Sequence, residues 1–584
     1  ISPNNLWVYD DDITIPTLLN PSDPASDTIY LPANIFVPTS DDPNQRFPAV
    51  IFISSWALNE YEYIPQAQIL ADKGYVVLSY TTRGFYNSPG AITTAGIEDF
   101  SDGSAAIDYL LDSRNGYPVD PDAIGLAGIS YGAGISLLTG FNDERVKAIV
   151  AMSGWVDLID SLWAGNTPNY AWIELLIFSS QPIPLLASNN PSPEIETNYA
   201  NMKVHENVAA TKEWGYVRSA ASYLDMVNAR ENPPAIYMAN NLHDYLFQPD
   251  SLFTTLKQYN GDWRLDLSRG VHGSGEASGL LGNEENTVWE NLGLWFDHYL
   301  KGIDNGINTA KPFSTKVLNT AKRESYDSLS PEDEIKIFNL IPESGAQGGQ
   351  LSETYANTVD LEVSFSTLDR ITYPGWITGA LSATGRTLNF NEIDRSLGLV
   401  FTTPILDAPL RLRGEAKVNL AIVGEDKAQY FGYLFYLNPN TGIANWIGHA
   451  PFSCHQSEGC VVNDGDLVQI VLDFYWTAVD IPAGSQLMLV IDGNDPDYWR
   501  YETTPETNTV VFQSNQAAYL ELPVVWENTQ YDDPVANFEQ AQDLARGANG
   551  DDSSFSGSGA GGSVPFMLLL AGLGYVATRK HFSS

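Results

Sequence analysis

The residues best suited to chemistry in this chain are a serine, a histidine and an aspartate that together could form a nucleophilic triad. Ser130 stands in Gly128-Ile129-Ser130-Tyr131-Gly132, a Gly-x-Ser-x-Gly pattern that follows an apolar run and opens a helical pattern. In that context the pattern presents a serine hydroxyl on a tight strand-to-helix turn at the carboxyl edge of a sheet. A chance glycine-rich turn has the same five letters, so the choice between the two interpretations depends on the partners.

The partners of such a serine are expected later in the chain, an acid first and then a histidine. Asp244 lies in a loop after a predicted strand at 235–239, and His272 lies in a later loop. Asp250 is the rival acid, but it follows Pro249 further into the loop. We therefore predict Ser130 as nucleophile, His272 as general base and Asp244 as its acidic partner. The remaining histidines have ordinary interpretations as cap, loop, helix-surface, β-domain or tail residues: His205, His243, His298, His449, His455 and His581.

Elements that could position these residues alternate through the first half of the chain. Such alternation of short apolar strands with helices predicts a parallel sheet covered on both faces. The first clear core strand is expected at Ala49, after about 45 residues. The predicted strands are 49–54, 75–80, 124–127, 147–153 and 235–239, and the predicted helices are 64–72, 97–111 and 133–139.

The alternation of strands and helices stops between about 157 and 232, where several helical patterns surround a Pro/Asn/Ser-rich break. An insertion of this length between two sheet strands predicts a helical cap over the active site. After about residue 315 the pattern becomes alternating, which predicts an all-β sandwich or jelly roll. The expected organisation is an α/β-hydrolase domain at 1–315, a β domain at 316–530, an acidic Gly/Ser linker at 531–563 and a hydrophobic tail at 564–584.

Composition excludes some partners. The 584 residues include 72 Asp and Glu against 30 Lys and Arg, a net charge of −42, while 43% of residues are hydrophobic. Nucleic acid is not expected as a partner, because phosphate binding needs clustered basic residues, and an anionic membrane surface is disfavoured for the same reason. Disorder is excluded by the abundance of core-forming residues. An acidic surface suits export to a salty medium, where ions screen repulsion, although any soluble acidic protein could carry it.

The two cysteines, Cys454 and Cys460, predict a small disulfide loop and hence an oxidising compartment. A zinc site that adds His449 and His455 is the alternative, but the spacing fits no common zinc pattern. The acidic segment Asp492–Asp497 has oxygen ligands that suit calcium, but it does not match the helix–loop–helix pattern, so a solvated turn is expected. The triad chemistry itself requires no metal or organic cofactor.

A family resemblance rests on several short segments. Together they resemble the Xaa-Pro dipeptidyl-peptidase/cocaine esterase family, whose members are also called CocE/NonD hydrolases. The resemblance extends over about residues 30–525. It implies an α/β-hydrolase domain, a C-terminal jelly roll and the same Ser130, Asp244 and His272 triad. The segments are Thr82-Arg83-Gly84, Ser88-Pro89-Gly90, the Ser130 motif, Trp295–Gly302, Asp407–Gly414 and Ile481–Leu487.

The expected oxyanion site departs from that family. The main-chain N–H of Tyr131, directly after the nucleophile, is the first expected donor. In the family a tyrosine hydroxyl after the strand equivalent to 49–54 supplies the second, and this chain has Trp56 at that place. Either the indole N–H of Trp56 donates, or Trp56 packs and a nearby main-chain N–H donates. The family's substrate range therefore does not transfer directly.

The expected reaction is acyl transfer to water from an ester or an amide. Trp155, Trp163 and Trp172 are predicted to bind an apolar or aromatic acyl group, with core packing as the alternative. Family peptidases need an anionic site for a substrate's amino terminus, for which Glu174 and Asp157 are candidates. Those peptidases usually have an additional helical N-terminal domain, and the size of this chain is nearer the esterases. An ester is favoured, dipeptidyl-peptidase activity is the alternative, and a carbohydrate-binding protein with an inactive hydrolase scaffold is an alternative of another class.

The C-terminal residues resemble a sorting signal. A Gly/Ser-rich stretch at 547–563 precedes the apolar run Val564–Ala577 and the basic residues Arg579 and Lys580. This order resembles the GlyGly-CTERM tail of secreted bacterial proteins, which implies transient inner-membrane attachment and cleavage by a rhomboid-type sorting protease. The alternative is a C-terminal helix packed on the protein. A chain that begins at Ile1 also fits removal of a signal peptide, and we expect a secreted protein, extracellular or at the bacterial cell surface.

Overall fold

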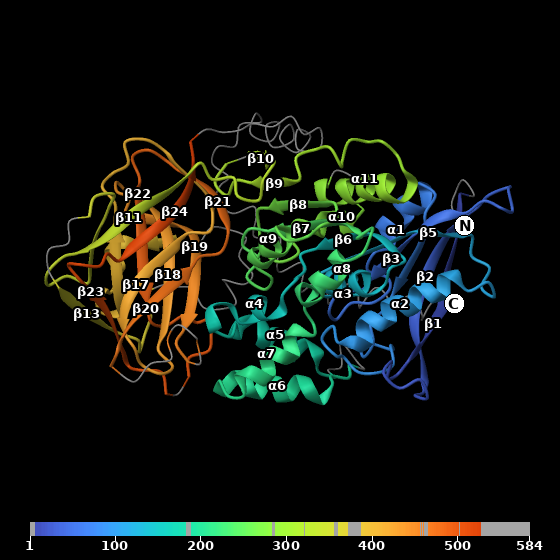
Figure 1. Ribbon diagram of the computed structural model, residues 1–584, viewed down its shortest axis with the longest axis horizontal. Coiled ribbons are helices and arrows are strands. Elements are labelled where there is room, and N and C mark those ends of the chain that lie inside the picture. The colour runs from blue at the N-terminus through green and yellow to red at the C-terminus, as the bar shows by residue number, and fades with distance from the viewer. Residues whose placement is uncertain are drawn as a thin grey trace.

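The computed structural model describes residues 6–526, apart from 183–188, 283–285, 321, 356–359, 372–386, 456, 458–459, 461–464 and 502. The chain forms an α/β domain and an all-β domain that lie side by side (Figure 1). The linker and tail predicted at 531–563 and 564–584 lie outside the described residues. Within the described part, no helix combines the length and apolar character needed to cross a membrane.

The α/β domain is built on a mixed sheet in the order β1-β2-β4-β3-β5-β6-β7-β8-β9-β10. The strands from β4 to β9 in this order are parallel, while β1, β2 and β10 pair antiparallel at the two edges. The strands are β1 (Trp7–Leu18), β2 (Thr28–Pro38), β3 (Phe47–Ile53), β4 (Val76–Tyr80), β5 (Val119–Ile129), β6 (Val146–Met152), β7 (Ala235–Asn241), β8 (Trp263–Ser268), β9 (Phe313–Lys316) and β10 (Arg323–Tyr326).

Helices cover both faces of this sheet, as the buried apolar strands require. In β3, Ile51 and Ile53 pack with residues of α2 and α3, whereas Val50 and Phe52 pack with residues of α1 and α11. The helices of this domain are α1 (Ile64–Asp72), α2 (Ile97–Leu111), α3 (Tyr131–Asn142), α9 (Asp250–Leu256), α10 (Ala277–Leu280) and α11 (Thr287–Lys301).

The sheet begins earlier than the sequence analysis predicts. The strands β1 and β2 precede Ala49 and extend the sheet through β2, which pairs with β4. Burial in β1 alternates along much of its length, and Asp10 and Asp12 are exposed. An edge hairpin with one solvated face does not need a continuous apolar run. A prediction based on such runs therefore does not find it.

The helical cap lies between β6 and β7, over residues where the sequence predicts an insertion. It packs against both domains, and Figure 1 shows its helices between them. The Ala171 N–H donates to Asp497 O at 3.1 Å, and the Trp499 ring lies 5.3 Å from that of Tyr170. Cap residues are therefore positioned by the all-β domain as well as by their own helices. The cap helices are α4 (Leu158–Leu162), α5 (Tyr170–Ser180), α6 (Pro193–Val204), α7 (Val208–Tyr216) and α8 (Leu224–Asn228).

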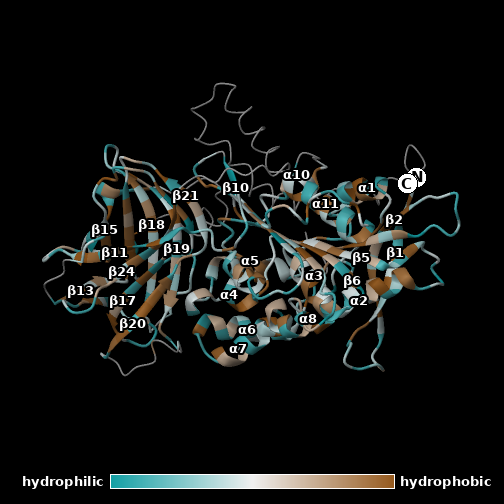
Figure 2. Cartoon of the chain, turned by 45° about the horizontal axis from the view of Figure 1, so that its top comes forward, coloured by the Kyte–Doolittle hydropathy of each residue, from teal (hydrophilic) through white to brown (hydrophobic). Residues whose placement is uncertain are grey.

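In the all-β domain, the described strands form one connected, largely antiparallel sheet with a single parallel pair, β12 with β15. Figure 2 shows hydrophobic residues concentrated on the strands of both sheets, while many connecting loops are hydrophilic. The strands are β11 (Glu334–Pro342), β12 (Gly348–Ser352), β13 (Leu361–Ser366), β14 (Thr387–Asn389), β15 (Gly398–Thr402), β16 (Leu410–Gly414), β17 (Lys417–Val423), β18 (Gln429–Asn438), β19 (Ile443–Ser453), β20 (Leu467–Asp473), β21 (Thr477–Ile481), β22 (Gln486–Asp492), β23 (Thr507–Phe512) and β24 (Tyr519–Val525).

Two local predictions in this domain have different outcomes. Cys454 and Cys460 are joined in a disulfide directly after β19. The acidic segment at 492–497 is not the solvated turn that we preferred, because Asp492 is fully buried and Asp495 is 5% exposed. The Asp492 carboxyl accepts main-chain N–H groups of Ile371, Gly493 and Asn494 instead of water. Burial raises its pKa to about 7.

Candidate active site

The nucleophile turn lies between β5 and α3 and is tightly packed. Ser130 has φ 56° and ψ −114°, outside the ordinary regions for a residue with a side chain. A Cβ on Gly132 would lie 2.0 Å from Ile53 O, and one on Gly128 would lie 2.5 Å from the carbonyl carbon of Gly132. The two glycines therefore let strand and helix approach closely enough to hold Ser130 in this strained conformation.

A methyl group at position 132 is expected to disturb this turn. Gly132→Ala should destabilise the fold by about 1–3 kcal/mol, because the obstacle is the main-chain oxygen of Ile53 and not a flexible side chain. Activity should fall as well, because the added methyl group displaces Ser130 from its position in the turn. Thermal melting and turnover measure both effects. Gly448→Ala is the control, because a Cβ there meets open space; equal melting temperatures for the two variants would contradict the prediction.

The structure brings the three predicted triad residues together. His272 Nε2 lies 2.9 Å from Ser130 Oγ, and His272 Nδ1 lies 2.8 Å from Asp244 Oδ2. Ser130 and His272 are each 6% exposed, and Asp244 is fully buried. The three residues follow β5, β7 and β8, so the carboxyl edge of the sheet collects side chains that lie 142 and 28 residues apart along the chain.

Asp244, and not Asp250, is the acid that reaches the histidine. Asp244 Oδ1 accepts the main-chain N–H groups of Leu246 and Phe247 at 3.1 and 2.9 Å. These bonds hold the carboxyl group so that Oδ2 is directed at the imidazole. Asp250 Oδ1 accepts the main-chain N–H of Trp476 in the all-β domain, so the rival acid contributes to domain contact.

The loop that carries His272 is anchored by polar residues that the sequence analysis did not identify. Ser153 Oγ accepts the Gly273 N–H at 3.2 Å and the Asn241 side-chain amide at 3.0 Å. It donates to Glu276 Oε1 at 2.8 Å, and burial raises the pKa of Glu276, which is 1% exposed. No local pattern marks these residues, because serine, asparagine and glutamate are common surface residues elsewhere.

The two residues predicted to supply the oxyanion donors, Tyr131 and Trp56, pack against each other. Tyr131 is the first residue of α3, where main-chain N–H groups have no acceptor within the helix. The indole N–H of Trp56 donates to Ser179 Oγ of α5 at 3.0 Å. Its ring packs edge-on against Phe85 and Tyr131, at 5.0 and 5.1 Å between ring centroids. In this structure the Trp56 indole therefore joins the cap to the turn.

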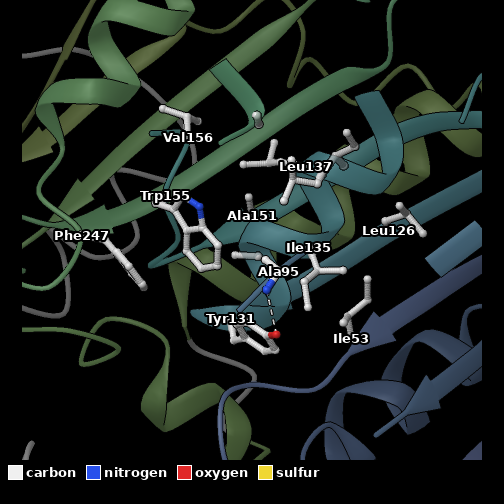
Figure 3. Packing of buried hydrophobic residues seen from close by; sticks show 14 of the residues in the cluster. Ile53, Ala95, Leu126, Tyr131, Ile135, Leu137, Ala151, Trp155, Val156 and Phe247 are labelled. Carbon is white, nitrogen blue, oxygen red and sulfur yellow. Dashed lines mark hydrogen bonds between the residues drawn. The ribbon is translucent and has the colours of Figure 1, made fainter. Parts of the chain in front are cut away.

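The three tryptophans predicted to bind substrate occupy different places. Trp172 of α5 lies edge-on to the His272 ring at 5.6 Å, which puts it beside the triad. Trp155 is 2% exposed and packs between Tyr131 and Phe247, with its indole N–H donating to Arg218 O (Figure 3). Trp163 is 3% exposed and lies against His205. For Trp155 and Trp163 the packing alternative therefore describes the structure, since neither ring reaches the surface.

Phe247 is a second aromatic neighbour of the histidine, with its ring 5.4 Å from that of His272. The two acids considered for an amino-terminus site have other partners. Asp157 caps α4 by accepting the N–H groups of Ile159 and Asp160, and Glu174 accepts the Tyr199 hydroxyl at 2.6 Å. Asp157 therefore caps a helix, and Glu174 of α5 is bonded to Tyr199 of α6.

Two family models match adjoining parts of the chain. Residues 27–274 match the X-Pro dipeptidyl-peptidase (S15 family) model, and residues 301–537 match the X-Pro dipeptidyl-peptidase C-terminal non-catalytic domain. A Rhodopirellula baltica protein provisionally named Xaa-Pro dipeptidyl-peptidase is 21% identical over 345 residues, which are 54% of this chain and 47% of that protein. The uncharacterized protein YcjY of Escherichia coli is 27% identical over 190 residues, which are 29% of this chain and 60% of that protein. The matches thus span about half of the first relative and 60% of the second.

Solved structures share the fold across both domains. A CocE/NonD family hydrolase from Staphylococcus aureus has a TM-score of 0.66 at 14% identity, over 89% of this chain and 94% of that one. An alpha-amino acid ester hydrolase has a TM-score of 0.67 at 14% identity, over 90% of this chain and 98% of that one. The two parts of the chain thus match the catalytic and the C-terminal domain models of X-Pro dipeptidyl-peptidases, and the two-domain fold is that of the solved CocE/NonD hydrolase.

Proposed function

We propose that this protein hydrolyses an ester or amide through an acyl-enzyme on Ser130, with an ester as the favoured substrate. The observation that carries the proposal is the hydrogen-bonded series from Ser130 Oγ through His272 to Asp244, with distances of 2.9 and 2.8 Å. These distances are within the range in which a base can accept the proton of a nucleophile. The strained nucleophile turn supports the same assignment.

His272 Nε2 takes the Ser130 proton as Oγ attacks the carbonyl carbon, and Asp244 stabilises the resulting imidazolium through its bond to Nδ1. The imidazolium then gives the proton to the leaving alcohol or amine, which leaves an acyl group on Ser130. A water molecule repeats the sequence, with His272 as base, and releases the acid. Because Asp244 and His272 are buried, their mutual attraction is weakly screened.

We assign the oxyanion donors to the main-chain N–H groups of Tyr131 and Trp56. The Trp56 indole hydrogen is already donated to Ser179, which favours the main-chain alternative for the second donor. The N–H of the preceding Ser55 is bonded to Glu62, so Trp56 is the next residue along that loop able to donate. Donors held rigidly before reaction stabilise the developing charge without reorganisation.

An ester substrate is favoured by the surroundings of the triad. Trp172 and Phe247 contact the histidine, and the half-buried Leu175, Leu176 and Ile177 continue the apolar character of α5. An apolar acyl group fits these neighbours. The engagement of Asp157 and Glu174 weakens the two candidates for a substrate ammonium site. Dipeptidyl-peptidase activity remains the second candidate, because both matched models and one relative carry that name.

The test is a substrate panel with an active-site label. p-Nitrophenyl esters of short and aromatic acids should be hydrolysed faster than Xaa-Pro p-nitroanilides, and a fluorophosphonate should label Ser130 stoichiometrically. Faster cleavage of the anilides would favour the peptidase. Absence of labelling together with absence of turnover would refute the hydrolase proposal and favour the carbohydrate-binding alternative, which glycan binding would then test.

We also propose that the protein acts outside the cytoplasm after transient membrane attachment through its C-terminal tail. The Cys454–Cys460 disulfide supports this, because disulfides persist in oxidising compartments. The expected result is that protein recovered from a producing culture's medium ends near the glycines at 561–562 by mass spectrometry. Replacing Gly561 and Gly562 with bulky residues should keep the protein with the cells. An intact tail on the protein in the medium would contradict processing by a sorting protease.

A further inference from the structure

Behind the proposed oxyanion site lies a fully enclosed polar cluster, made of Ser55, Glu62 and Tyr63, that triad chemistry does not use. These residues are 1%, 3% and 0% exposed. Glu62 Oε2 accepts the main-chain N–H of Ser55 at 2.8 Å, and Glu62 Oε1 lies 2.6 Å from Ser55 Oγ. One carboxyl therefore holds both the main chain and the side chain of the residue immediately before Trp56.

The same cluster holds the residue immediately before the nucleophile. The Ile129 N–H donates to the Tyr63 hydroxyl at 2.9 Å, and Ser55 Oγ lies 2.9 Å from Ile129 O. The Tyr63 hydroxyl in turn donates to Ile53 O at 3.2 Å. The ladder between β3 and β5 runs as far as Ile53 and Gly128. Beyond that point, side-chain hydroxyls replace direct main-chain bonds between the two segments.

The use of side-chain hydroxyls in place of main-chain hydrogen bonds follows from the geometry of the two segments. The two segments must separate at this point, because α3 starts between them and Gly132 already lies against Ile53 O. Separated strands leave buried main-chain groups without partners, which is costly unless other groups satisfy them. The Ser55 and Tyr63 hydroxyls satisfy Ile53 and Ile129, and Glu62 holds Ser55 in place.

We propose that Glu62 is a positioning residue for the hydrolytic reaction: through Ser55 and Tyr63 it sets the distance between the Trp56 and Tyr131 donors. The inference rests on the proposed function. Glu62 touches no reacting atom, and it acts by holding the main chain on both sides of the oxyanion site. A shift of about 1 Å in such a site can lower a rate about 10²-fold.

The number of hydrogens available to the cluster indicates the protonation state of Glu62 in which every close contact of Ser55 is a hydrogen bond. Ser55 has one hydroxyl hydrogen but lies within bonding distance of both Glu62 Oε1 and Ile129 O. Both contacts are full hydrogen bonds when a protonated Glu62 donates to Ser55 and Ser55 donates to Ile129 O. Burial raises the pKa of Glu62 to about 7, in agreement with this count. Among the described residues, the titratable side chains that interact with Glu62 are Tyr63 and Tyr86, and burial raises the pKa of both phenols.

The deciding experiment compares Glu62→Gln, which mimics the neutral carboxyl, with Glu62→Ala, which removes it. At pH 6 we expect Glu62→Gln to stay within about threefold of the wild type, and Glu62→Ala to lose about 10–100-fold in kcat with little change in KM. The ratio of kcat for Glu62→Gln to that of the wild type should rise at least about threefold from pH 6 to pH 9, because only the wild type loses the proton.

Melting temperatures measured at a series of pH values test the proposal independently of activity. Because the folded-state pKa is raised, wild-type protein binds more protons than its unfolded chain between about pH 4.5 and 7, and its stability falls as pH rises through that window. The melting temperature of Glu62→Gln relative to wild type should therefore increase across it. Gln66→Ala is the matched control, because Gln66 is a buried neighbour bonded to Gly279 O, away from the oxyanion loop.

The outcomes separate the two proposals. Wild-type protein without turnover or fluorophosphonate labelling would refute the hydrolase itself. An active wild type with equal kcat in Glu62→Ala and Gln66→Ala, or with equal losses in Glu62→Ala and Glu62→Gln, would overturn the positioning role alone. Should Glu62→Ala fail to fold, Ser55→Ala and Tyr63→Phe test the same cluster; unchanged kcat in both would also overturn the proposal.

Discussion

Ser130→Ala is expected to reduce kcat by at least about 10³-fold, because the acyl-enzyme path requires an oxygen nucleophile at the strained turn. Binding of substrate should persist, since the oxyanion donors and the apolar neighbours of His272 remain. Loss of one hydroxyl hydrogen-bonded to His272 should leave the fold intact. Turnover of a p-nitrophenyl ester and fluorophosphonate labelling test the loss of the nucleophile, equilibrium binding of the substrate tests its retention, and circular dichroism tests the fold.

Ser136→Ala is the matched control for this variant. Ser136 is buried on α3, six residues after Ser130, and its hydroxyl donates to Gly132 O. The substitution removes the same kind of hydroxyl from a nearby position without touching the triad, so kcat should stay within a few-fold of wild type. Retained turnover in Ser130→Ala would contradict the assignment of Ser130 as nucleophile. Equal losses in both variants would mean that helix packing and not chemistry is being measured.

Asp244→Asn has the second largest expected effect, a fall in kcat of about 10³–10⁴-fold. The amide keeps the shape of the carboxyl, but its NH₂ group can stabilise the imidazole tautomer with the hydrogen on Nε2. In that tautomer His272 cannot accept the Ser130 proton. The negative charge that stabilises the imidazolium is lost as well. Steady-state kinetics measure the loss, and labelling with a fluorophosphonate should slow in proportion.

Asp250→Asn is its control, because Asp250 is the other acid in this region and it contacts Trp476 instead of the histidine. Its kcat should remain near the wild-type value, although domain contact and melting temperature can change. A larger kinetic loss in Asp250→Asn than in Asp244→Asn would reverse the assignment. Because the paired variants share chemistry and chain neighbourhood, the difference between them isolates the bond to His272.

Many of the central elements were predictable from the sequence. The helix predicted at 64–72 is α1 and that at 97–111 is α2. The strand predictions at 49–54 and 235–239 fall on β3 and β7 with small shifts at the ends. These segments have buried apolar runs or helical periodicity, which depend on neighbours close in the chain. The order serine, acid, histidine was also readable, because it follows from strand order in the sheet.

The missed features share one physical cause. The edge strand β1 has exposed positions and three acidic residues, and β2, which joins it to β4, contains two prolines and an asparagine, so neither strand shows a continuous apolar run. Glu62 and Glu276 look like two more acids in a chain with 72 of them. Only burial distinguishes them, and burial is produced by elements distant in sequence. The burial of Trp155 and Trp163 likewise depends on elements distant in sequence that pack over their rings.

The sequence by itself determined the fold class, the presence of a Gly-x-Ser-x-Gly turn, and a serine, a histidine and two acids from which a triad could form. The tertiary structure decided which acid reaches His272, that the Trp56 indole bonds to Ser179, and that Trp172 lies beside the triad. This difference between sequence and structure follows from how far apart along the chain the interacting residues lie. Patterns along a chain report hydrophobicity and local geometry, whereas a hydrogen bond depends on distances below about 3.5 Å between atoms that the sheet brings together.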